Sequence, residues 1–374
     1  MRGKSMKKAL LLGTSAIVAA GMFAAPAHAA DPIEISVGGF MNQWFGYQDN
    51  DDASGVDTQT FEQWSNSEII FNGKTTLDNG LQVGVQVQLE ANTFGDQIDE
   101  SFAFVEGSFG RFVIGSENDA AYLMHYAAPN VGLPINSGSQ YHHISNPTGG
   151  GMFRTVFGST FITPAGDDDG QKITYFTPRF SGFQFGVSYL PDIDTTGGDR
   201  NSLTTEQADY TDGFSVGLNY VNSFSGFDLA AAGGYYYASA PDAAAPTGGS
   251  IDDFQAFSLG LNVGFGGFTL GGSYADITEG AIAGTRTTEG MGYDVGLSYE
   301  TGALGFSVTY YHGETDGDVF IAGDDEHDSY AGSVSYAIGP GVSVLGTLGY
   351  TEFDGEAGND NDGFYLTTGL ALSF

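Results

Sequence analysis

The sequence has no cysteine and little positive charge. Only 11 lysines and arginines stand against 46 aspartates and glutamates, for a formal net charge of −35. Without cysteine, neither disulfides nor thiolate metal sites can stabilise the fold. A strongly negative molecule repels the phosphates of nucleic acids and attracts cations. The composition therefore excludes a nucleic-acid partner and a cross-linked scaffold.

Long apolar runs are also missing, except at the N-terminus. Ala9–Ala25 is apolar, follows a lysine- and arginine-containing start and precedes Ala27-His28-Ala29, which is the pattern of a secretory signal with its cleavage site. We predict a signal peptide over 1–29, with a membrane-anchoring helix as the alternative, and one mature domain over 30–374. Four of the basic residues lie in the signal, which leaves seven against 46 acidic residues. No later stretch reaches the ~18–20 apolar residues of a spanning helix.

Glycine and aromatic residues are abundant instead, with 58 Gly, 29 Phe and 20 Tyr. These residue types favour strands and tight turns over helices. The C-terminal half repeats one unit: an alternating apolar stretch, a short turn, a second such stretch and a longer acidic loop. The stretches are Phe227–Ala240, Asp253–Phe265, Phe268–Glu279, Glu289–Tyr299, Leu304–Glu314, Asp328–Ile338, Val342–Phe353 and Gly363–Phe374. This pattern predicts an antiparallel sheet that closes into a barrel with one apolar and one water-facing side.

The clearest strand runs over Leu81–Glu90. Valine and leucine at every second position alternate there with amide and carboxylate side chains, among them Gln86, Gln88 and Glu90. Such a polar row is typical of the water-filled inside of a membrane barrel, whose outside faces hydrocarbon. An edge strand of a soluble sheet is the alternative for this segment alone.

Counting along the chain gives 16 strands, with short turns such as Asp78-Asn79-Gly80 alternating with longer loops. An even strand number with short turns at one end and long loops at the other predicts an all-β, transmembrane, antiparallel barrel. One connection, 118–170, is far longer than the others, and a loop of this length inside a compact domain is usually functional. We expect it to fold inward and narrow the lumen. If Met152–Thr163 formed an extra hairpin, the barrel would have 18 strands.

Three segments carry a specific resemblance: Asn72–Leu81, Gly107–Gly115 and the terminal Phe374. With the organisation of the whole mature chain, they resemble the Gram-negative trimeric general porins, most of all the alphaproteobacterial type. The resemblance implies a homotrimer in the outer membrane, exported through the periplasm and in contact with lipid and lipopolysaccharide. It implies no catalysis and no cofactor, and it makes Phe374 a residue that serves assembly.

In that family acidic residues of the third loop, here 118–170, face basic residues on the barrel wall. The acidic residues that fit are Glu117, Asp119, Asp167, Asp168 and Asp169. The pore wall would carry Glu68, Lys74, Gln86, Gln88, Glu90, Arg111 and Lys172. The expected function is passive diffusion of small hydrophilic solutes and ions, with a preference for cations because of the negative charge. A substrate-tuned outer-membrane channel is the alternative.

Three short patterns resemble catalytic or metal sites. Gly213–Gly217 matches G-x-S-x-G, but the alternation continues through Ser215, whereas the nucleophile elbow needs a strand-to-helix turn. A barrel hydrolase that pairs Ser215 with a loop histidine is the less favoured alternative. His142-His143 lacks a third metal ligand at a recognised spacing. Gly149-Gly150-Gly151 lacks the lysine of a phosphate loop.

Acidic clusters in the loops supply the oxygen ligands that calcium prefers. The candidates for a structural calcium are Asp49, Asp51, Asp52, Asp324, Asp325 and Glu326. None of the clusters forms a complete EF-hand loop, so solvated loops are the simpler interpretation. Divalent cations that bridge loops to lipopolysaccharide are a second one. A secreted calcium-dependent binding protein is a third, although its uninterrupted apolar faces would aggregate in water.

Overall fold

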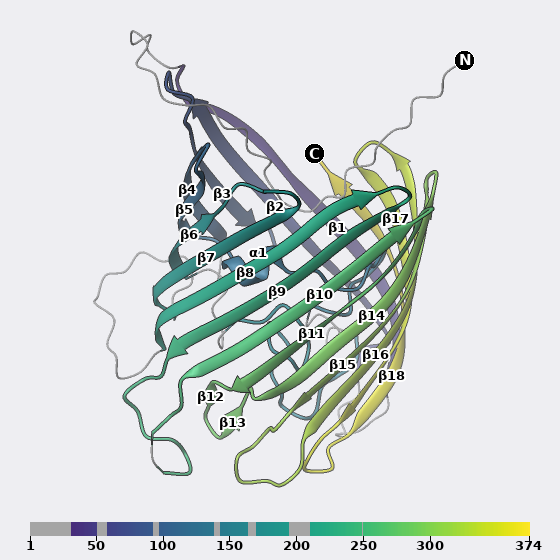
Figure 1. Ribbon diagram of the computed structural model, residues 1–374. Helices are drawn as coiled ribbons and strands as arrows, with labels where there is room; N and C mark the ends of the chain where they lie inside the picture. Colours follow the sequence, from purple (N-terminus) through teal and green to yellow (C-terminus); the bar gives the residue numbers. More distant parts are fainter. Residues whose placement is uncertain are drawn as a thin grey trace.

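A computed structural model describes residues 31–50, 58–92, 97–137, 143–163, 170–193, 210–248 and 250–374. In it, sixteen antiparallel strands form one closed barrel (Figure 1). The barrel strands are β1 (Glu34–Asn50), β2 (Phe61–Thr76), β3 (Gln82–Glu90), β4 (Ile98–Gly107), β5 (Gly110–Ser116), β6 (Gln171–Phe176), β7 (Phe183–Asp192), β8 (Thr211–Phe224), β9 (Phe227–Ser239), β10 (Phe254–Phe265), β11 (Phe268–Glu279), β14 (Gly290–Thr301), β15 (Leu304–Thr315), β16 (Asp325–Gly339), β17 (Val342–Asp354) and β18 (Asn361–Ser373). The prediction of an all-β, 16-stranded antiparallel barrel is confirmed.

Three small elements complete the described part of the chain. The strands β12 (Ile282–Ala283) and β13 (Arg286–Thr287) form a separate two-stranded sheet in the loop between β11 and β14, and Arg286 also bridges to Asp318. The helix α1 (Ala120–Met124) follows β5 and lies within the barrel outline (Figure 1). Met152–Thr163 contains no strand, so the alternative of 18 barrel strands is wrong. The segment is instead a series of turns.

The barrel closes where the first and last strands meet. Phe40 on β1 pairs with Ser373 on β18. The amide of Gly39 donates to the carbonyl of Phe374 at 3.0 Å, and the amide of Phe374 donates back at 3.1 Å. Closure leaves no strand edge with unpaired backbone groups, which hydrocarbon could not solvate. The hydrogen-bond ladder thus stabilises a chain that has no disulfide.

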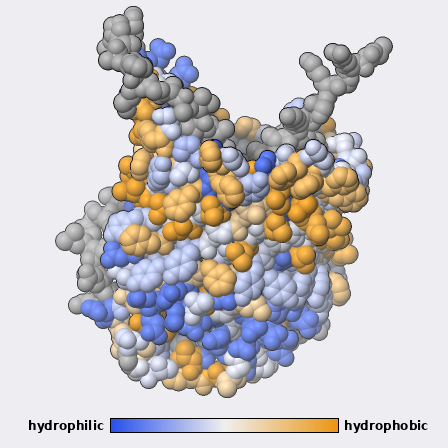
Figure 2. Space-filling model, in the orientation of Figure 1, coloured by the Kyte–Doolittle hydropathy of each residue, from blue (hydrophilic) through white to orange (hydrophobic). Residues whose placement is uncertain are grey.

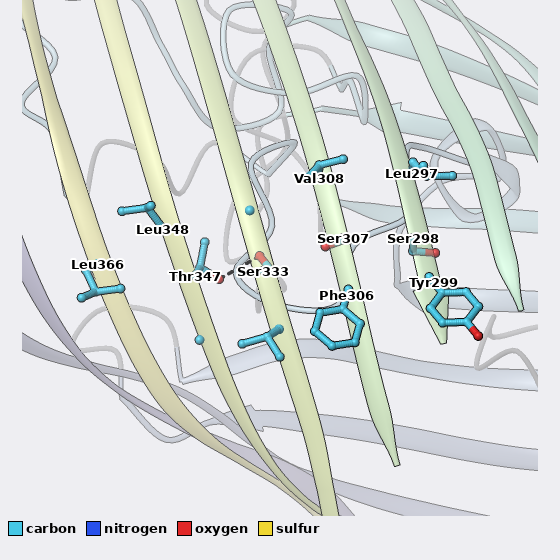
Figure 3. Close-up of a pocket in the computed structure, with 13 residues that line it drawn as sticks. Leu297, Ser298, Tyr299, Phe306, Ser307, Val308, Ser333, Thr347, Leu348 and Leu366 are labelled. Carbon is cyan, nitrogen blue, oxygen red and sulfur yellow. Dashed lines mark hydrogen bonds between the residues drawn. The ribbon is translucent and has the colours of Figure 1, made fainter. Parts of the chain in front are cut away.

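Side chains along each strand sort into two sets. Val85 and Leu370 are 40% and 39% exposed on the outside, whereas the alternate residues Tyr365 and Thr367 of β18 are buried inside. On neighbouring strands Leu348 and Val308 likewise point away from the interior (Figure 3). Apolar residues gather over the upper part of the outer surface in Figure 2, and hydrophilic ones gather near the long loops below. Opposite faces of one strand therefore meet different solvents, as period-2 alternation predicts.

The two ends of the barrel differ. Short turns lie at the end that holds the described chain termini, and the longer loops lie at the other (Figure 1). The turn after β2 uses Gly80 at φ 83°, and the turn after β8 uses Gly226 at φ 109°. L side chains rarely adopt these values, so glycine fits there. Within the described residues no helix has the length and apolarity needed to cross a membrane.

Several strands extend further toward the long loops than the sequence pattern indicates. β16 begins at Asp325 rather than Asp328, and β18 begins at Asn361 rather than Gly363. These extensions contain polar residues that interrupt the apolar alternation. Cross-strand pairing, rather than side-chain hydropathy, decides their conformation. The predicted signal peptide over 1–29 lies outside the described residues.

Candidate functional site

The long segment between β5 and β6 begins at a capped helix attached to the inner wall. Asp119 is the N-cap of α1, and its carboxylate accepts the amide of Ala121 at 2.8 Å. The hydroxyl of Ser215 on β8 donates to the same carboxylate and accepts the Ala121 amide at 2.8 Å. Ser188 on β7 accepts the amide of Ala120 at 2.9 Å. Ser215 thus holds the helix in place and is not placed as a nucleophile.

Further along, the segment is fixed by one buried carboxylate, Asp294 on β14. Its Oδ2 accepts the amide of Ala128 at 2.9 Å and the side-chain amide of Asn136 at 2.7 Å. Its Oδ1 accepts the backbone amide and the hydroxyl of Ser273 on β11, at 2.5 and 2.6 Å. Four hydrogen bonds meet on one side chain. Such a network positions the loop only while all its members are satisfied.

Later parts of the segment contact the inner wall on further strands. Wall hydroxyls on β17 and β15 take part: Thr347 accepts the amide of Leu133 at 3.0 Å, and Tyr311 donates to the carbonyl of Val156 at 2.5 Å. His143 stacks on Tyr365 of β18, with ring centroids 4.6 Å apart. The segment therefore contacts the inner face from β7 round to β18.

Small residues on the inner face make room for this close packing. A Cβ added to Gly217 would lie 2.5 Å from the carbonyl oxygen of Ala120, and one added to Gly234 would lie 2.9 Å from the Cβ of Ala121. A Cβ on Gly260 would overlap the carbonyl oxygen of Tyr126, and one on Gly313 would overlap that of Val156. The loop backbone thus lies directly on the strand backbone. Figure 3 shows the inward Ser307, Ser333 and Thr347 on the same wall, with the Ser333–Thr347 hydrogen bond of 2.9 Å drawn.

Burial also shapes the chemistry of the segment's charged groups. Burial raises the pKa of the Glu117 carboxyl, against hydrogen bonds that lower it. It lowers the pKa of His125 to about 4, so that this imidazole is neutral at neutral pH. The Nε2 of His125 lies 3.1 Å from the hydroxyl of Thr160, which itself accepts from Asn136. His125 is thus a structural residue of the packed loop.

Of the predicted acidic residues of the constriction, Glu117 and Asp119 lie together with Lys172 at the root of the segment. All three are buried, at 9%, 2% and 3% exposed. The ammonium of Lys172 donates to the backbone carbonyl of Glu117. These three residues hold the base of the loop rather than facing open water. Asp167, Asp168 and Asp169 lie outside the described residues.

The other predicted wall residues lie across the lumen, on β2 to β5. Lys74 on β2 is exposed, and Gln86 and Gln88 on β3 are half-buried. Arg111 on β5 places its guanidinium 4.4 Å from the ring centre of Phe104 on β4. These strands are opposite β10, β11, β14 and β15 in the barrel order. The inserted segment and its root also contact this wall, because the ring centroid of His143 lies 5.7 Å from that of Trp64 on β2 and Asn118 donates to Glu100 on β4 at 2.7 Å.

One acidic cluster on this wall could hold a cation. Single carboxylate oxygens of Glu68, Glu90 and Asp99 all lie within 4.8 Å of one another. Glu68 and Glu90 are direct cross-strand partners on β2 and β3. Asp99 belongs to β4, next to an irregularity in the pairing of β3 with β4. Carboxylate oxygens at this spacing suit a hard divalent cation.

The proposed calcium ligands do not form a single group. Asp325 is fully buried and forms an ion pair with Arg286 of β13, whose other Nη lies 3.4 Å from Glu356. Glu326 is the next residue on the same strand, so it points to the opposite face. Asp324 and Asp49 are exposed. Asp51, Asp52 and His142 lie outside the described residues.

The sequence pattern did not identify two groups that define the site. The residues around Asp294 alternate between apolar and polar like those of any other strand, and its role depends on contacts with a segment about 160 positions away in the chain. Arg154 lies on the inserted segment itself, where no periodicity predicts its contacts with the ring of Tyr122 and the side-chain oxygen of Asn118. The small inward residues could be identified from the sequence, because Ser188, Ser215 and Ser273 occupy every second position of their strands, near glycines.

Comparisons with known proteins agree with this architecture. A family model described as Gram-negative porin matches residues 13–356. An outer membrane porin protein of Bordetella pertussis is 27% identical over 370 residues, which cover 91% of this chain and 84% of that protein. An uncharacterized protein of Rickettsia bellii is 23% identical over 299 residues, covering 63% of this chain and 68% of that protein. A loop-deletion mutant of the Vibrio cholerae outer membrane protein OmpT has a TM-score of 0.62 at 14% identity, covering 92% of this chain and all of that one.

Proposed function

The chain belongs to the Gram-negative porin family of non-enzymatic outer-membrane channels, and on that premise we propose its specific mode of action. It passes small hydrophilic solutes and ions by passive diffusion and prefers cations. Residues 118–170 narrow the lumen, within a single barrel domain that is exported by the signal peptide over 1–29. The chain is of the alphaproteobacterial type.

The observation that carries this proposal is the attachment of the inserted segment to the inner wall. Hydrogen bonds to Ser188, Asp294 and Thr347 fix it on β7, β14 and β17. A segment held at several points cannot swing out of the lumen as one body. The free cross-section is then limited to the space that the segment leaves inside the barrel, and the aperture there sets the size cutoff.

Cation preference follows from charge. The mature chain has seven basic residues against 46 acidic ones if residues 1–29 are removed. A negative potential in and around a channel raises the local concentration of cations and lowers that of anions. The half-buried Glu90 adds negative charge on the inner wall itself.

The test is the reversal potential of the purified protein in planar bilayers under a tenfold potassium chloride gradient. We expect discrete conductance steps and a reversal potential whose sign shows that potassium is more permeant than chloride. Raising the salt concentration on both sides should weaken the preference, because the Debye length shrinks from ~10 Å at 0.1 M to ~3 Å at 1 M. A bilayer that stays sealed would contradict the channel itself, and anion preference would contradict only the selectivity.

The homotrimer is the second part of the proposal, and one outer surface supports it. Gln43 on β1 and Gln63 and Ser65 on β2 occupy outward positions, with Gln43 opposite Ser65 and Gln63 opposite Phe45. On the far wall the outward positions hold residues such as Leu259 and Leu261. Amide groups are poorly tolerated in hydrocarbon. Contact with a second and third copy would cover them.

Native mass spectrometry in mild detergent tests this surface. We expect a mass of three chains for the wild type. Ser65→Trp places a bulky ring on the surface and should yield monomers, whereas Leu261→Trp on the far wall should leave the trimer intact. A monomeric wild type would refute the trimer. A trimeric Ser65→Trp variant would show that the contact lies elsewhere.

A further inference from the structure

Residues 201–374 contain a single lysine or arginine, Arg286, against 24 aspartates and glutamates. Arg286 lies on β13, in the long loop between β11 and β14 (Figure 1). Its side chain is 27% exposed, so the guanidinium is mostly shielded from water. A lone cation in so acidic a region attracts carboxylates from the loops that can reach it. The position of Arg286 therefore decides which loops come together.

Two buried carboxylates from different parts of the chain share the Arg286 guanidinium. One Nη donates to Asp325 at the start of β16, and the other lies 3.4 Å from Glu356 in the loop between β17 and β18. The side chains of Asp325 and Glu356 are only 1% and 2% exposed. The Asp325 carboxylate also accepts the backbone amide of Glu356 at 3.1 Å. Without the guanidinium, two buried negative charges would be left uncompensated, which is strongly unfavourable.

The loop between β15 and β16 joins the same group. The backbone amide of Asp318 donates to the Glu356 carboxylate at 2.7 Å, and the hydroxyl of Thr285 donates to the Asp318 carboxylate at 2.6 Å. The amide of Val319 donates to the carbonyl of Thr285 at 2.9 Å, beside the strand bridge between Arg286 and Asp318. Backbone, hydroxyl and ionic contacts thus connect three of the long loops at one point.

The inserted segment reaches this point as well. A Cβ added to Gly149 would lie 3.7 Å from the Nε of Arg286, so the guanidinium lies beside the backbone of the segment. Asn359 in the loop between β17 and β18 donates to the carbonyl of Pro147 at 2.5 Å. These contacts connect the three loops to the same segment that is fixed to the inner wall elsewhere along its length.

We propose that Arg286 is a latch that joins the loops β11–β14, β15–β16 and β17–β18 to the inserted segment, so that all four move as one unit. The two carboxylates hold the loops together only while the guanidinium neutralises them. Loss of this cation would free the loops to fluctuate, and the fluctuation would reach the segment through Pro147 and Gly149. The latch rests on the proposed function, because the segment on which it acts narrows the lumen.

Amide hydrogen exchange of the purified protein tests the latch. In Arg286→Gln we expect exchange around Asp318 and Glu356 to become roughly tenfold faster than in the wild type, since the carboxylates lose their cation. Exchange around Thr148 and Gly150 in the inserted segment should become about threefold faster, because the unit moves together. In planar bilayers the variance of the open-channel current should rise about twofold for the same reason.

Two further variants separate the latch from a general loss of stability. Arg179→Gln is the matched control, because Arg179 is exposed at the turn between β6 and β7 and donates to the carbonyl of Gly182 there. It should match the wild type in exchange and in current variance. Arg286→Lys keeps the charge but lacks the planar fork that reaches both carboxylates, so exchange around Asp318 and Glu356 should become only about threefold faster. This variant decides the question if Arg286→Gln does not assemble.

Four results would overturn the latch while leaving the channel intact. Unchanged exchange in both Arg286 variants would show that other contacts hold the loops. Faster exchange around Asp318 and Glu356, without a change around Thr148 and Gly150, would show that the loops are joined only to one another. An equal effect in Arg179→Gln would indicate a general loss of stability, and unchanged current variance would show that the motion does not reach the lumen. Failure of the proposed function would look different, because the wild type would carry no current.

Discussion

Replacing Gly260 with valine should lower the single-channel conductance by roughly half, because the aperture sets the flow. The new side chain would overlap the carbonyl oxygen of Tyr126, which lies on the β10 backbone. The strand itself accepts valine, since Gly260 has no positive φ and strands favour β-branched residues. The closed barrel cannot widen without breaking its ladder, so the loop must move toward the lumen axis. Overpacking of this kind costs about 1–3 kcal/mol.

Gly332→Val is the matched control for this experiment. Gly332 lies on the outer face of β16, where an added Cβ meets nothing within 4 Å. The same substitution there should leave the conductance unchanged. Unchanged conductance in Gly260→Val would contradict the position of the loop beside the water path. An increased conductance would mean that the loop had left the lumen, which also contradicts the expectation.

Replacing Asp294 with alanine should have the opposite effect and make the channel wider and noisier. The substitution leaves the amides of Ala128 and Asn136 and the Ser273 groups without their acceptor. Each buried donor left unsatisfied costs about 1–3 kcal/mol. The middle of the inserted segment should then detach transiently from β14. We expect higher mean conductance and more current noise. Amide hydrogen exchange around Ala128 should become faster by on the order of a hundredfold.

Asp276→Ala removes the same charge from the neighbouring strand β11 without touching the loop. Among the described residues the Asp276 carboxylate accepts from the half-buried Tyr274, at 2.7 Å, and it faces outward. Hydrogen exchange and current noise should match the wild type in this control. Equal exchange in Asp294→Ala and in the wild type would show that the four hydrogen bonds do not fix the segment.

Much of the barrel was predictable because the two solvents of a membrane barrel impose a period of two on every strand. The rows through Val85 and Leu370 could be assigned to the outside, and Gln86 to the inside, from alternation alone. Strand ends were less predictable. The extension of β16 to Asp325 depends on pairing with β15, and local hydropathy does not show which residues of a neighbouring strand will pair.

The site was predictable only in part. The family resemblance identified a loop with acidic residues and a basic wall, and the structure does bring Glu117 and Lys172 together. It brings them together in a buried anchor, however, where they do not face open water. Burial of a loop residue is decided by which wall it contacts, and no periodic pattern in the loop encodes that contact.

The sequence by itself determined the closed barrel, its strand number and the sorting of side chains, because alternation and turn residues act within a few positions of the chain. Only the tertiary structure decided what fills the lumen. The contact of Tyr126 with Gly260, and the bonds of Asp294 to Ala128 and Asn136, join residues more than a hundred positions apart. Such contacts depend on the shape of the completed cylinder, and that shape exists only after all sixteen strands have paired.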